Sequence, residues 1–337
     1  MVKAITRMLS VRLLRFAGLA FIGATFAAAT TLPAAAESVE ELYEAAKAEG
    51  ELVLYMNDNL NSVQVMVAAF KEAYPGIKVD FFKGDTSQVM LRFETESAAG
   101  RHTVDLVTTT DRQAKQLFFV KGYTAAYRPL NLDMYPESLH APENGWVAYS
   151  LILNAIAWNT DLVKGDEIPT NWQDLRDPKW RGRLGMQDPL LGGGAGIWTV
   201  TMYQLWGAAL WEDWMQEFGA QEVRYGRFAE VREMLASGEI AIQLVAYPSF
   251  MQPTIDKGAP IEWGVIDSTL FTALSFNLSK FAQHPNAAKL FIEFFTSREG
   301  QQVIAGLKQI PALPDMLPPI FERIKGVTLH PQAHELE

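Results

Sequence analysis

Hydrophobic and polar positions from residue 38 onward alternate between two periods, one typical of amphipathic helices and one of buried strands. The stretch 38–49 predicts a helix, because Ser38 is placed to cap it and Glu41 to complete a capping box. The apolar run 51–55 predicts the first strand. Further strands are predicted at 77–82, 104–108, 183–187 and 240–245, and helices at 62–74, 88–98, 197–218, 224–237, 285–297 and 297–307. Strands and helices that alternate at this spacing indicate a parallel α/β sheet.

Two more apolar runs, 146–159 and 271–278, have the pattern of buried strands. The first is long enough to pass from one domain into another. We therefore expect an α/β protein with more than one structural unit.

Polar loops follow the first three predicted strands. They contain Asn57-Asp58-Asn59, then 83–87, then Thr109-Thr110-Asp111. In a parallel α/β sheet, the loops at the carboxyl ends of the strands line the ligand crevice. A solvated loop is an equally good interpretation of any single residue, but three such loops in succession favour a binding site.

The first 36 residues have the pattern of an export signal. Four cations and no acidic residue precede an apolar stretch at 16–29, and Ala34-Ala35-Ala36 supplies small residues for cleavage. The apolar stretch is shorter than the roughly 20 residues that span a bilayer. We therefore expect cleavage after residue 36 and export to a bacterial periplasm.

Composition narrows the possible partners. The 337-residue chain is 49% hydrophobic and 20% charged, ordinary globular values for a chain long enough for two domains. Removing 1–36 takes away four cations, so the formal net charge changes from −10 to −14, which disfavours nucleic acid or an anionic membrane as a partner. The chain has no cysteine, so disulfides, thiol catalysis, zinc–thiolate sites and iron–sulfur clusters are excluded.

A glycine-rich run, Gly192-Gly193-Gly194-Ala195-Gly196, lies between a predicted strand and a predicted helix. Backbone N–H groups that converge at a helix N-terminus suit a phosphate, phosphonate, sulfonate or carboxylate. The run matches neither the dinucleotide-binding pattern nor a P-loop. A flexible turn is the structural alternative.

Motifs for catalysis are sparse. There is no Gly-x-Ser-x-Gly elbow and no His-Glu-x-x-His helix, and the five histidines fall in predicted loops or in the tail. A pair of cleft carboxylates in a glycosidase-like hydrolase is compatible with the sequence but has no motif in its favour. We expect a protein that is not an enzyme and that has no cofactor and no metal.

Several segments together resemble a known family. The more specific ones are Asp177-Pro178-Lys179-Trp180 and Ser237-Gly238-Glu239-Ile240, and weaker ones lie at 52–55, 76–79, 104–107, 286–291 and 297–301. In this order they resemble the extracellular solute-binding proteins of ABC transporters, in the branch that includes the ferric-ion-binding periplasmic proteins. The resemblance implies a type II Venus-flytrap fold in which two α/β lobes close on a ligand, and a transporter permease as partner.

The resemblance also implies a domain division. Strands would cross between the lobes near Ile152 and near Thr272. Lobe I would then comprise 37–151 plus 272–310, and lobe II 152–271 plus 311–337. We expect the mature protein to act as a monomer.

The iron site of the ferric-binding members is where this sequence departs from the family. Asn59 stands in place of their histidine, and Thr110 in place of their glutamate. Their tyrosine pair falls at Pro248 and Ser249, beside Tyr247. Because most of the charge that a trivalent ion needs is lost, we expect a small organic or phosphorus-containing anion as ligand.

The predicted binding site draws on both halves of the chain. Backbone amides of the glycine run and hydroxyls of three threonines would hold the anionic group, an arginine would add positive charge, and strand-end side chains would set specificity. The site residues are Asn57, Asp58, Asn59, Thr108, Thr109, Thr110, Asp111, Gly192, Gly193, Gly194, Arg227, Tyr247 and Ser249, with Arg112 and Arg224 as alternative cations.

Three alternatives stay open. The first is a ferric-ion or ferric-chelate binding protein that uses Tyr247 and Asp111. The second is an exported hydrolase with cleft carboxylates. The third is an adhesin-like or regulatory binding module that works without a transporter.

Overall fold

The computed structural model describes residues 38–110, 114, 116–191, 194–267, 269–324 and 330–331. The predicted export signal, residues 1–36, lies outside these residues. In the described part of the chain, no helix is both long and apolar enough to cross a membrane.

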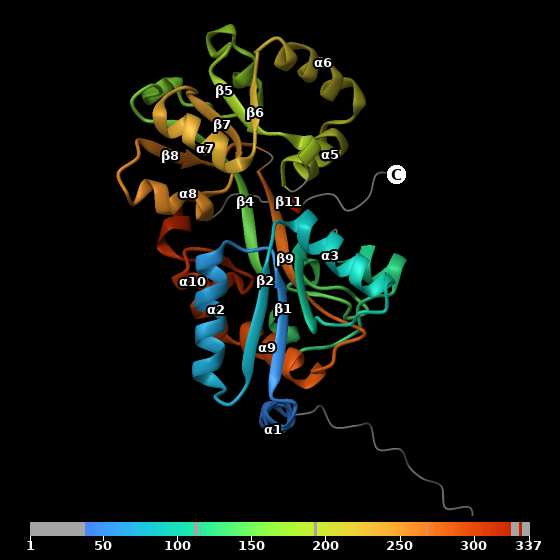
Figure 1. The fold of residues 1–337 in the computed structure, drawn as a ribbon. Helices are drawn as coiled ribbons and strands as arrows, with labels where there is room; N and C mark the ends of the chain where they lie inside the picture. Colours follow the sequence, from blue (N-terminus) through green and yellow to red (C-terminus); the bar gives the residue numbers. More distant parts are fainter. Residues whose placement is uncertain are drawn as a thin grey trace, which may run out of the picture. The chain divides into compact units, whose positions relative to one another are not determined.

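The elements follow one another largely as the hydrophobic pattern predicts (Figure 1). The strands are β1 (Glu51–Met56), β2 (Lys78–Lys83), β3 (Leu106–Thr110), β4 (Val147–Asn159), β5 (Leu184–Gln187), β6 (Arg224–Gly226), β7 (Ile242–Ala246), β8 (Ile261–Gly264), β9 (Leu270–Leu278), β10 (Ile310–Pro311) and β11 (His330–Pro331). The α-helices are α1 (Val39–Glu49), α2 (Leu60–Ala73), α3 (Thr86–Ala98), α5 (Gly194–Trp206), α6 (Ala208–Gly219), α7 (Phe228–Ser237), α8 (Pro248–Ile255), α9 (Pro285–Thr296) and α10 (Arg298–Gly306). The predicted capping box of Ser38 and Glu41 is present at α1.

The strands join in the order β2-β1-β3-β9-β4-β7-β5-β6, with β8 and β10 on β4 and β11 on β9. Pairing is parallel within β1–β3 and within β5–β7, as predicted. Between the two parallel groups the pairing is antiparallel, because β9 runs antiparallel to both β3 and β4, and β4 runs antiparallel to β7. We call β1–β3 the first strand set and β5–β7 the second strand set.

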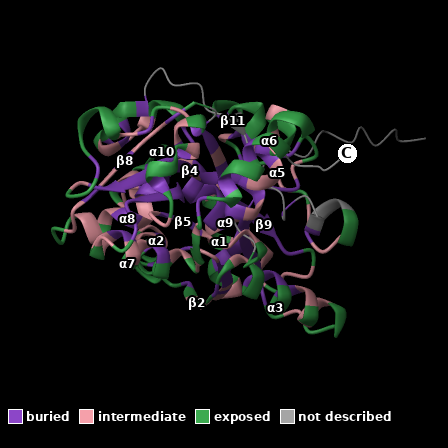
Figure 2. Cartoon of the chain, turned by 90° about the horizontal axis from the view of Figure 1, so that it is seen from above, coloured by how far each residue is buried: buried purple, intermediate pink, exposed green. Residues whose placement is uncertain are grey.

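Strand β4 joins the two strand sets. Its residues from Val147 to Asn154 pair with β9, and those from Ala155 to Asn159 pair with β7 and β8. Figure 1 shows β4 and β9 side by side between the two sets, and β4 is mainly buried in Figure 2. The change of pairing partner after Asn154 lies close to the predicted crossing at Ile152.

The apolar side chains form separate core clusters. The first holds residues of the first strand set with α1, α2 and α9, for example Leu54, Phe70 and Phe291. Two further clusters surround the second strand set, one with α5 and α6 and one with α7, α8 and Phe321. The predicted lobe boundaries stay a prediction, and the segment after β10 contributes to both sides, since Leu313 packs in the first cluster.

Two predicted helices differ from the structure. The helix predicted at 197–218 is two helices, α5 and α6, because Gly207 between them has φ +75°, in the left-handed region that glycine adopts readily. The helix predicted at 224–237 begins only at Phe228, and its first residues form β6, which pairs with β5.

Asp105 fastens three segments of the first strand set. Its buried carboxylate accepts hydrogen bonds from the backbone N–H of Val53 at 2.9 Å, of Gln283 at 2.8 Å and of His284 at 2.9 Å. The ring of His284 lies 2.9 Å from the second carboxylate oxygen. One side chain therefore links β1, the start of β3 and the segment that leads into α9.

We expect Asp105→Ala to lower the free energy of unfolding by about 3 kcal/mol, because three buried backbone donors lose their acceptor. Urea unfolding followed by tryptophan fluorescence measures the change. The control is Asp133→Ala, which breaks an exposed ion pair with Arg128 at 2.6 Å and is expected to change stability by less than about 1 kcal/mol. Equal effects of the two substitutions would contradict this role of Asp105.

Candidate functional site

The topology turns the carboxyl ends of the two strand sets toward each other. Strands β3 and β4 both run antiparallel to β9, so β3 points along β4 toward the second set, whereas β7 is antiparallel to β4 and points back. Both ends can be located along β4. The end of β3 at Thr110 is level with Ser150 of β4, because both pair with Leu274 of β9. The end of β7 at Ala246 pairs with Ala155 of β4. At about 3.3 Å per residue, the two ends are separated by roughly 16 Å along β4.

At the end of the first set, Asn57 and Thr108 form one hydrogen-bonded unit. The backbone N–H of Asn57 donates to Thr108 Oγ1 at 2.9 Å, and that hydroxyl donates to Asn57 Oδ1 at 2.8 Å. Asn57 Nδ2 donates to Thr86 Oγ1 at 3.1 Å, at the start of α3. The structure thus brings together two predicted site residues and adds Thr86, which lies in a predicted polar loop from which no residue was selected.

The sequence predicts that the hydroxyls of the three consecutive threonines of β3 act together, but the strand places them on two faces. Side chains alternate along a strand, so Thr108 and Thr110 share one face and Thr109 lies on the other. Thr109 is fully buried, and its carbonyl accepts a hydrogen bond from Ser275 Oγ at 3.2 Å. A ligand that contacts Thr108 and Thr110 cannot also reach the Thr109 hydroxyl on the opposite face.

Asp58 lies inside the protein. Tyr149 donates a short hydrogen bond to Asp58 Oδ2, and Gln309 Nε2 donates to Oδ1 at 3.3 Å. Burial raises the pKa of Asp58, while the hydrogen bonds from Tyr149 and Gln309 and the charge of Lys83 act to lower it. These partners make Asp58 a support for the loop after β1, since a ligand contact would require breaking the bond from Tyr149.

Asn59 and Lys83 flank this support. Asn59 Oδ1 accepts from the backbone N–H of Ser62 at 2.9 Å, so this predicted ligand residue caps α2. Lys83 is exposed at the carboxyl end of β2, where its charge acts on Asp58. Lys83 is not among the predicted site residues, although a cation at the end of a predicted strand is a signal that the sequence carries.

At the second set, Tyr247 packs against the start of α5. Its hydroxyl donates to Gln187 Oε1 at 3.1 Å, at the end of β5. Burial raises the pKa of Tyr247, with a backbone hydrogen bond to Ala195 acting in the opposite direction. A Cβ on Gly194 would overlap the hydroxyl oxygen of Tyr247, so glycine is required there for this approach. The structure therefore places two of the predicted site residues, Gly194 and Tyr247, in contact and adds Gln187 beside them.

The backbone just before Tyr247 has an unusual conformation. Val245 is fully buried with φ +51°, in the left-handed region that a β-branched residue rarely adopts. Opposite it, the register between β4 and β7 shifts between Ala155 and Ala157. Together these irregularities set the direction in which the chain carries Tyr247 out of β7.

The remaining predicted residues are dispersed. Arg227 is exposed just before α7, where its backbone N–H donates to Glu230 Oε2 at 2.8 Å, and its neighbour Phe228 stacks on Tyr247 with ring centres 4.8 Å apart. Arg224 is exposed on β6. Ser249 is half-buried in the first turn of α8 and lines a pocket of about 680 Å³ between α2, α8 and α10. Asp111, Arg112, Gly192 and Gly193 lie outside the described residues.

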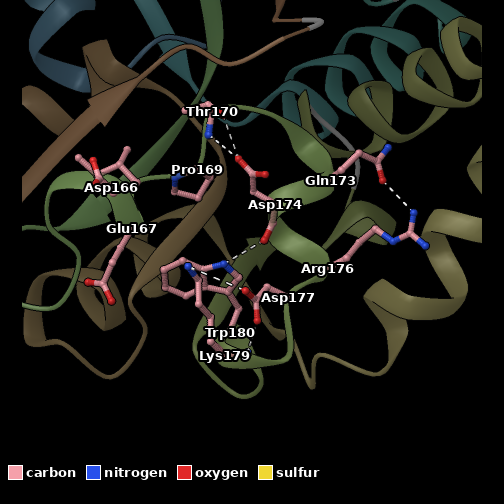
Figure 3. A pocket seen from close by; sticks show the side chains of 11 residues that line it. Asp166, Glu167, Pro169, Thr170, Gln173, Asp174, Arg176, Asp177, Lys179 and Trp180 are labelled. Atoms are coloured by element: carbon pink, nitrogen blue, oxygen red, sulfur yellow. Dashed lines mark hydrogen bonds and ion pairs between the residues drawn. The ribbon is translucent and has the colours of Figure 1, made fainter.

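A second pocket, of about 560 Å³, lies in the segment 166–180 that precedes β5 (Figure 3). Its side chains mainly stabilise this segment: the backbone N–H of Thr170 donates to Asp174 Oδ2 at 2.8 Å, and Trp180 Nε1 donates to the Asp174 carbonyl at 3.1 Å. Because the segment leads into the amino end of β5, this pocket is separate from the strand-end site.

In the described residues, no three His, Asp or Glu side chains lie close enough together to hold a metal ion. The positions that the family resemblance assigns to a ferric site hold Asn59, Thr110, Pro248 and Ser249, none of which carries an anionic donor.

We expect Gly194→Ala to lower the free energy of unfolding by about 1–3 kcal/mol, because the new methyl group overlaps the Tyr247 hydroxyl. Tyr247→Phe removes that hydroxyl and should partly rescue the alanine variant. A double-mutant cycle in urea measures the coupling, expected at about 1 kcal/mol. Strictly additive effects would contradict the contact.

Asp58 makes stability depend on pH. Because burial raises its pKa above the ordinary 3.8, the unfolded chain releases this proton first, and ionisation of Asp58 opposes folding increasingly as pH rises above about 4. We expect Asp58→Asn, which carries no charge, to gain stability relative to the wild type between pH 4 and pH 7. Unfolding curves at several pH values test this, and a relative loss with rising pH would refute it.

Residues 56–302 match a family model described as bacterial extracellular solute-binding protein. A solved substrate binding protein of an ABC transporter from Agrobacterium tumefaciens is 19% identical with TM-score 0.73, covering 83% of this chain and 86% of that one. Iron-bound HitA from Pseudomonas aeruginosa is 22% identical with TM-score 0.72 and coverage of 82% and 90%. The periplasmic binding protein AfuA from Actinobacillus pleuropneumoniae, with fructose-6-phosphate bound, is 23% identical with TM-score 0.69 and coverage of 80% and 88%.

The likeness to these structures confirms the predicted fold class, a two-lobed periplasmic binding protein of type II. The family model covers well over half of the chain, from β1 to α10. This chain belongs to the family of bacterial extracellular solute-binding proteins.

Proposed function

We propose that this protein is the periplasmic substrate-binding component of an ABC import system, and that it captures a small anionic solute between two lobes. The solute class is a phosphonate, organophosphate, sulfonate or carboxylate. The mature chain acts as a monomer, closes on the solute and delivers it to the transporter permease. Lobe I comprises 37–151 plus 272–310, and lobe II comprises 152–271 plus 311–337.

The observation that carries the proposal is the start of α5. Gly194 opens this helix beside Tyr247 and Gln187, at the end of the second strand set that faces the first. A helix N-terminus presents backbone N–H groups and a partial positive charge, which together favour an anion. The glycines that precede it, Gly192 and Gly193, extend this run of amides in the sequence.

Positive charge and neutral donors support the same ligand class. Lys83 stands at the end of the first set and Arg227 at the end of the second. Both side chains are exposed, and neither forms an ion pair with another described residue. Asn57, held by Thr108 and Thr86, can offer the remaining N–H of its amide group as a neutral donor. In a chain with an acidic net charge, such local cations are needed to hold an anion.

The relatives illustrate both kinds of cargo on one fold, iron in HitA and fructose-6-phosphate in AfuA. The choice for this chain therefore depends on its own side chains. The positions that the resemblance assigns to the iron ligands are uncharged, whereas an amide and a cation stand at the end of the first strand set and a cation and the α5 N-terminus at the end of the second. This combination favours an organophosphate-like anion over a ferric ion.

We expect an anion from this class to raise the thermal midpoint of the mature protein. A ligand at 100 times its Kd stabilises the folded state by about 2.7 kcal/mol. Native mass spectrometry of the gently purified protein identifies a solute that travels with it, and a thermal-shift screen ranks phosphonates, organophosphates, sulfonates, carboxylates and ferric citrate. Failure of every anion class would refute the proposal.

Charge variants locate the site. Lys83→Gln is expected to weaken anion binding about five- to tenfold, because it removes a cation at the strand end. The matched control is Lys78→Gln, at the opposite end of the same strand, which removes the same charge and is expected to leave the Kd unchanged.

A visible absorption band with ferric citrate that is lost in Tyr247→Phe would instead support the ferric-chelate alternative, and turnover of the bound solute would support a hydrolase.

A further inference from the structure

We propose that Asn154, Thr272 and Thr110 form a polar floor that binds hydroxyl groups of the solute. The proposal rests on the function proposed above and narrows its ligand to a hydroxylated organic anion, as opposed to a bare inorganic anion or an apolar one. Asn154 and Thr272 lie within apolar runs that predict buried strands, and neither is among the predicted site residues.

All three side chains are buried without a hydrogen-bond partner. Asn154 is 1% exposed, Thr272 3% and Thr110 4%. Both the Nδ2 and Oδ1 atoms of Asn154 lack a partner, and so do the Oγ1 atoms of Thr272 and Thr110. Buried polar groups in folded proteins are almost always satisfied, so a group of unsatisfied ones needs an external partner to account for it.

The strand register puts these side chains on one face. Thr272 pairs with Ile152 and Asn154 pairs with Leu270 across β4 and β9, so Asn154 and Thr272 are diagonal neighbours. Thr110 pairs with Leu274, two residues along β9 from Thr272. Paired residues and those two apart share a face of the sheet. The three polar side chains therefore form a continuous row across β3, β9 and β4.

This row lies between the two strand ends that face each other. Ile152 and Ile156, which flank Asn154 on the same face of β4, both pack with the cluster that contains Ala195 at the start of α5 and Tyr247. Ile152 also packs against the core of the first strand set. The floor is thus on the side of the sheet where the α5 N-terminus lies, within the span that separates Thr110 from Ala246.

The chemistry of the floor selects the group that it binds. An amide and two hydroxyls supply both donors and acceptors but no charge, so they suit hydroxyl groups, which also donate and accept. An ionised group placed on this floor would be buried without a counter-charge, which is unfavourable. The anionic end of the solute is accordingly held at the α5 N-terminus and the strand-end cations, and its hydroxylated end lies on the floor.

Two other buried threonines with unpartnered hydroxyls, Thr109 and Thr124, do not share this arrangement. Thr109 lies on the opposite face of β3, and Thr124 lies beside Ser279, roughly 23 Å along β9 from Thr272. Thr124 therefore provides a matched control, because it is also a buried threonine with an unpartnered hydroxyl.

The test compares Thr272→Val and Asn154→Leu, which keep shape and remove polarity, with Thr124→Val. Calorimetry measures Kd for pairs of anions that share a charged group: fructose 6-phosphate with inorganic phosphate, glycerol 3-phosphate with propyl phosphate, glycerate with propionate, and isethionate with ethanesulfonate. We expect the wild type to bind the hydroxylated member of at least one pair tenfold or more tightly. Thr272→Val and Asn154→Leu are expected to reduce that preference to within twofold, and Thr124→Val to preserve it.

Stability of the ligand-free proteins provides a second measurement. Because the two floor substitutions remove unsatisfied polar atoms, we expect urea midpoints equal to or higher than that of the wild type. Lower midpoints in both variants would assign these side chains to the fold and overturn the proposal. If the wild type binds both members of every pair equally, or if its preference survives both substitutions, the floor proposal is overturned and the anion proposal stands. Failure of all eight anions, together with failure of every anion class in the thermal-shift screen, would overturn the anion proposal and the floor with it.

Discussion

The antiparallel pairing of β4 with β9 is the constraint on which the rest of the structure depends. Each strand set is internally parallel, and by itself would present its carboxyl ends to solvent. Strand β9 runs antiparallel to both β3 and β4, so β3 and β4 point in the same direction. Strand β4 then extends to pair antiparallel with β7, and the carboxyl ends of the two sets therefore face each other. Every side chain assigned to the site owes its position to this reversal, including residues more than a hundred positions apart in the chain.

Local hydrogen bonds then fix the individual groups. Asp105 holds β1 and the start of β3 to the segment before α9, so the loop at the end of β1 starts from a fixed base. Asp58 binds Tyr149 on β4 and Gln309 just before β10, which fastens that loop to two strands. Asn57, Thr86 and Thr108 are joined on this support. The polar groups at the first strand set are therefore held in place before any solute arrives.

Much of the fold follows from the hydrophobic pattern, whereas the site follows from it only in part. The strands of the first set and the capping box of α1 are predictable, because they depend on local periodicity and local hydrogen bonds. The break at Gly207 is hidden inside a long apolar stretch, and β6 is too short to have a period of its own. Asn154 and Thr272 have no local signal at all, since their significance comes from the register between β4 and β9. Sequence identifies the loops that meet, but pairing decides which side chains share a face.

The conformation of Val245 has a consequence for motion. A β-branched residue at φ +51° stores backbone energy that the surrounding packing must sustain. That energy is released when the end of β7 opens locally, so the free energy of local opening is lower there than in the regular strands beside it. We therefore expect the amide protons around Tyr247 to exchange with solvent more readily than those in the middle of β9, although both segments are buried. The end of β7 next to the start of α5 is therefore expected to open more easily than the regular strands beside it.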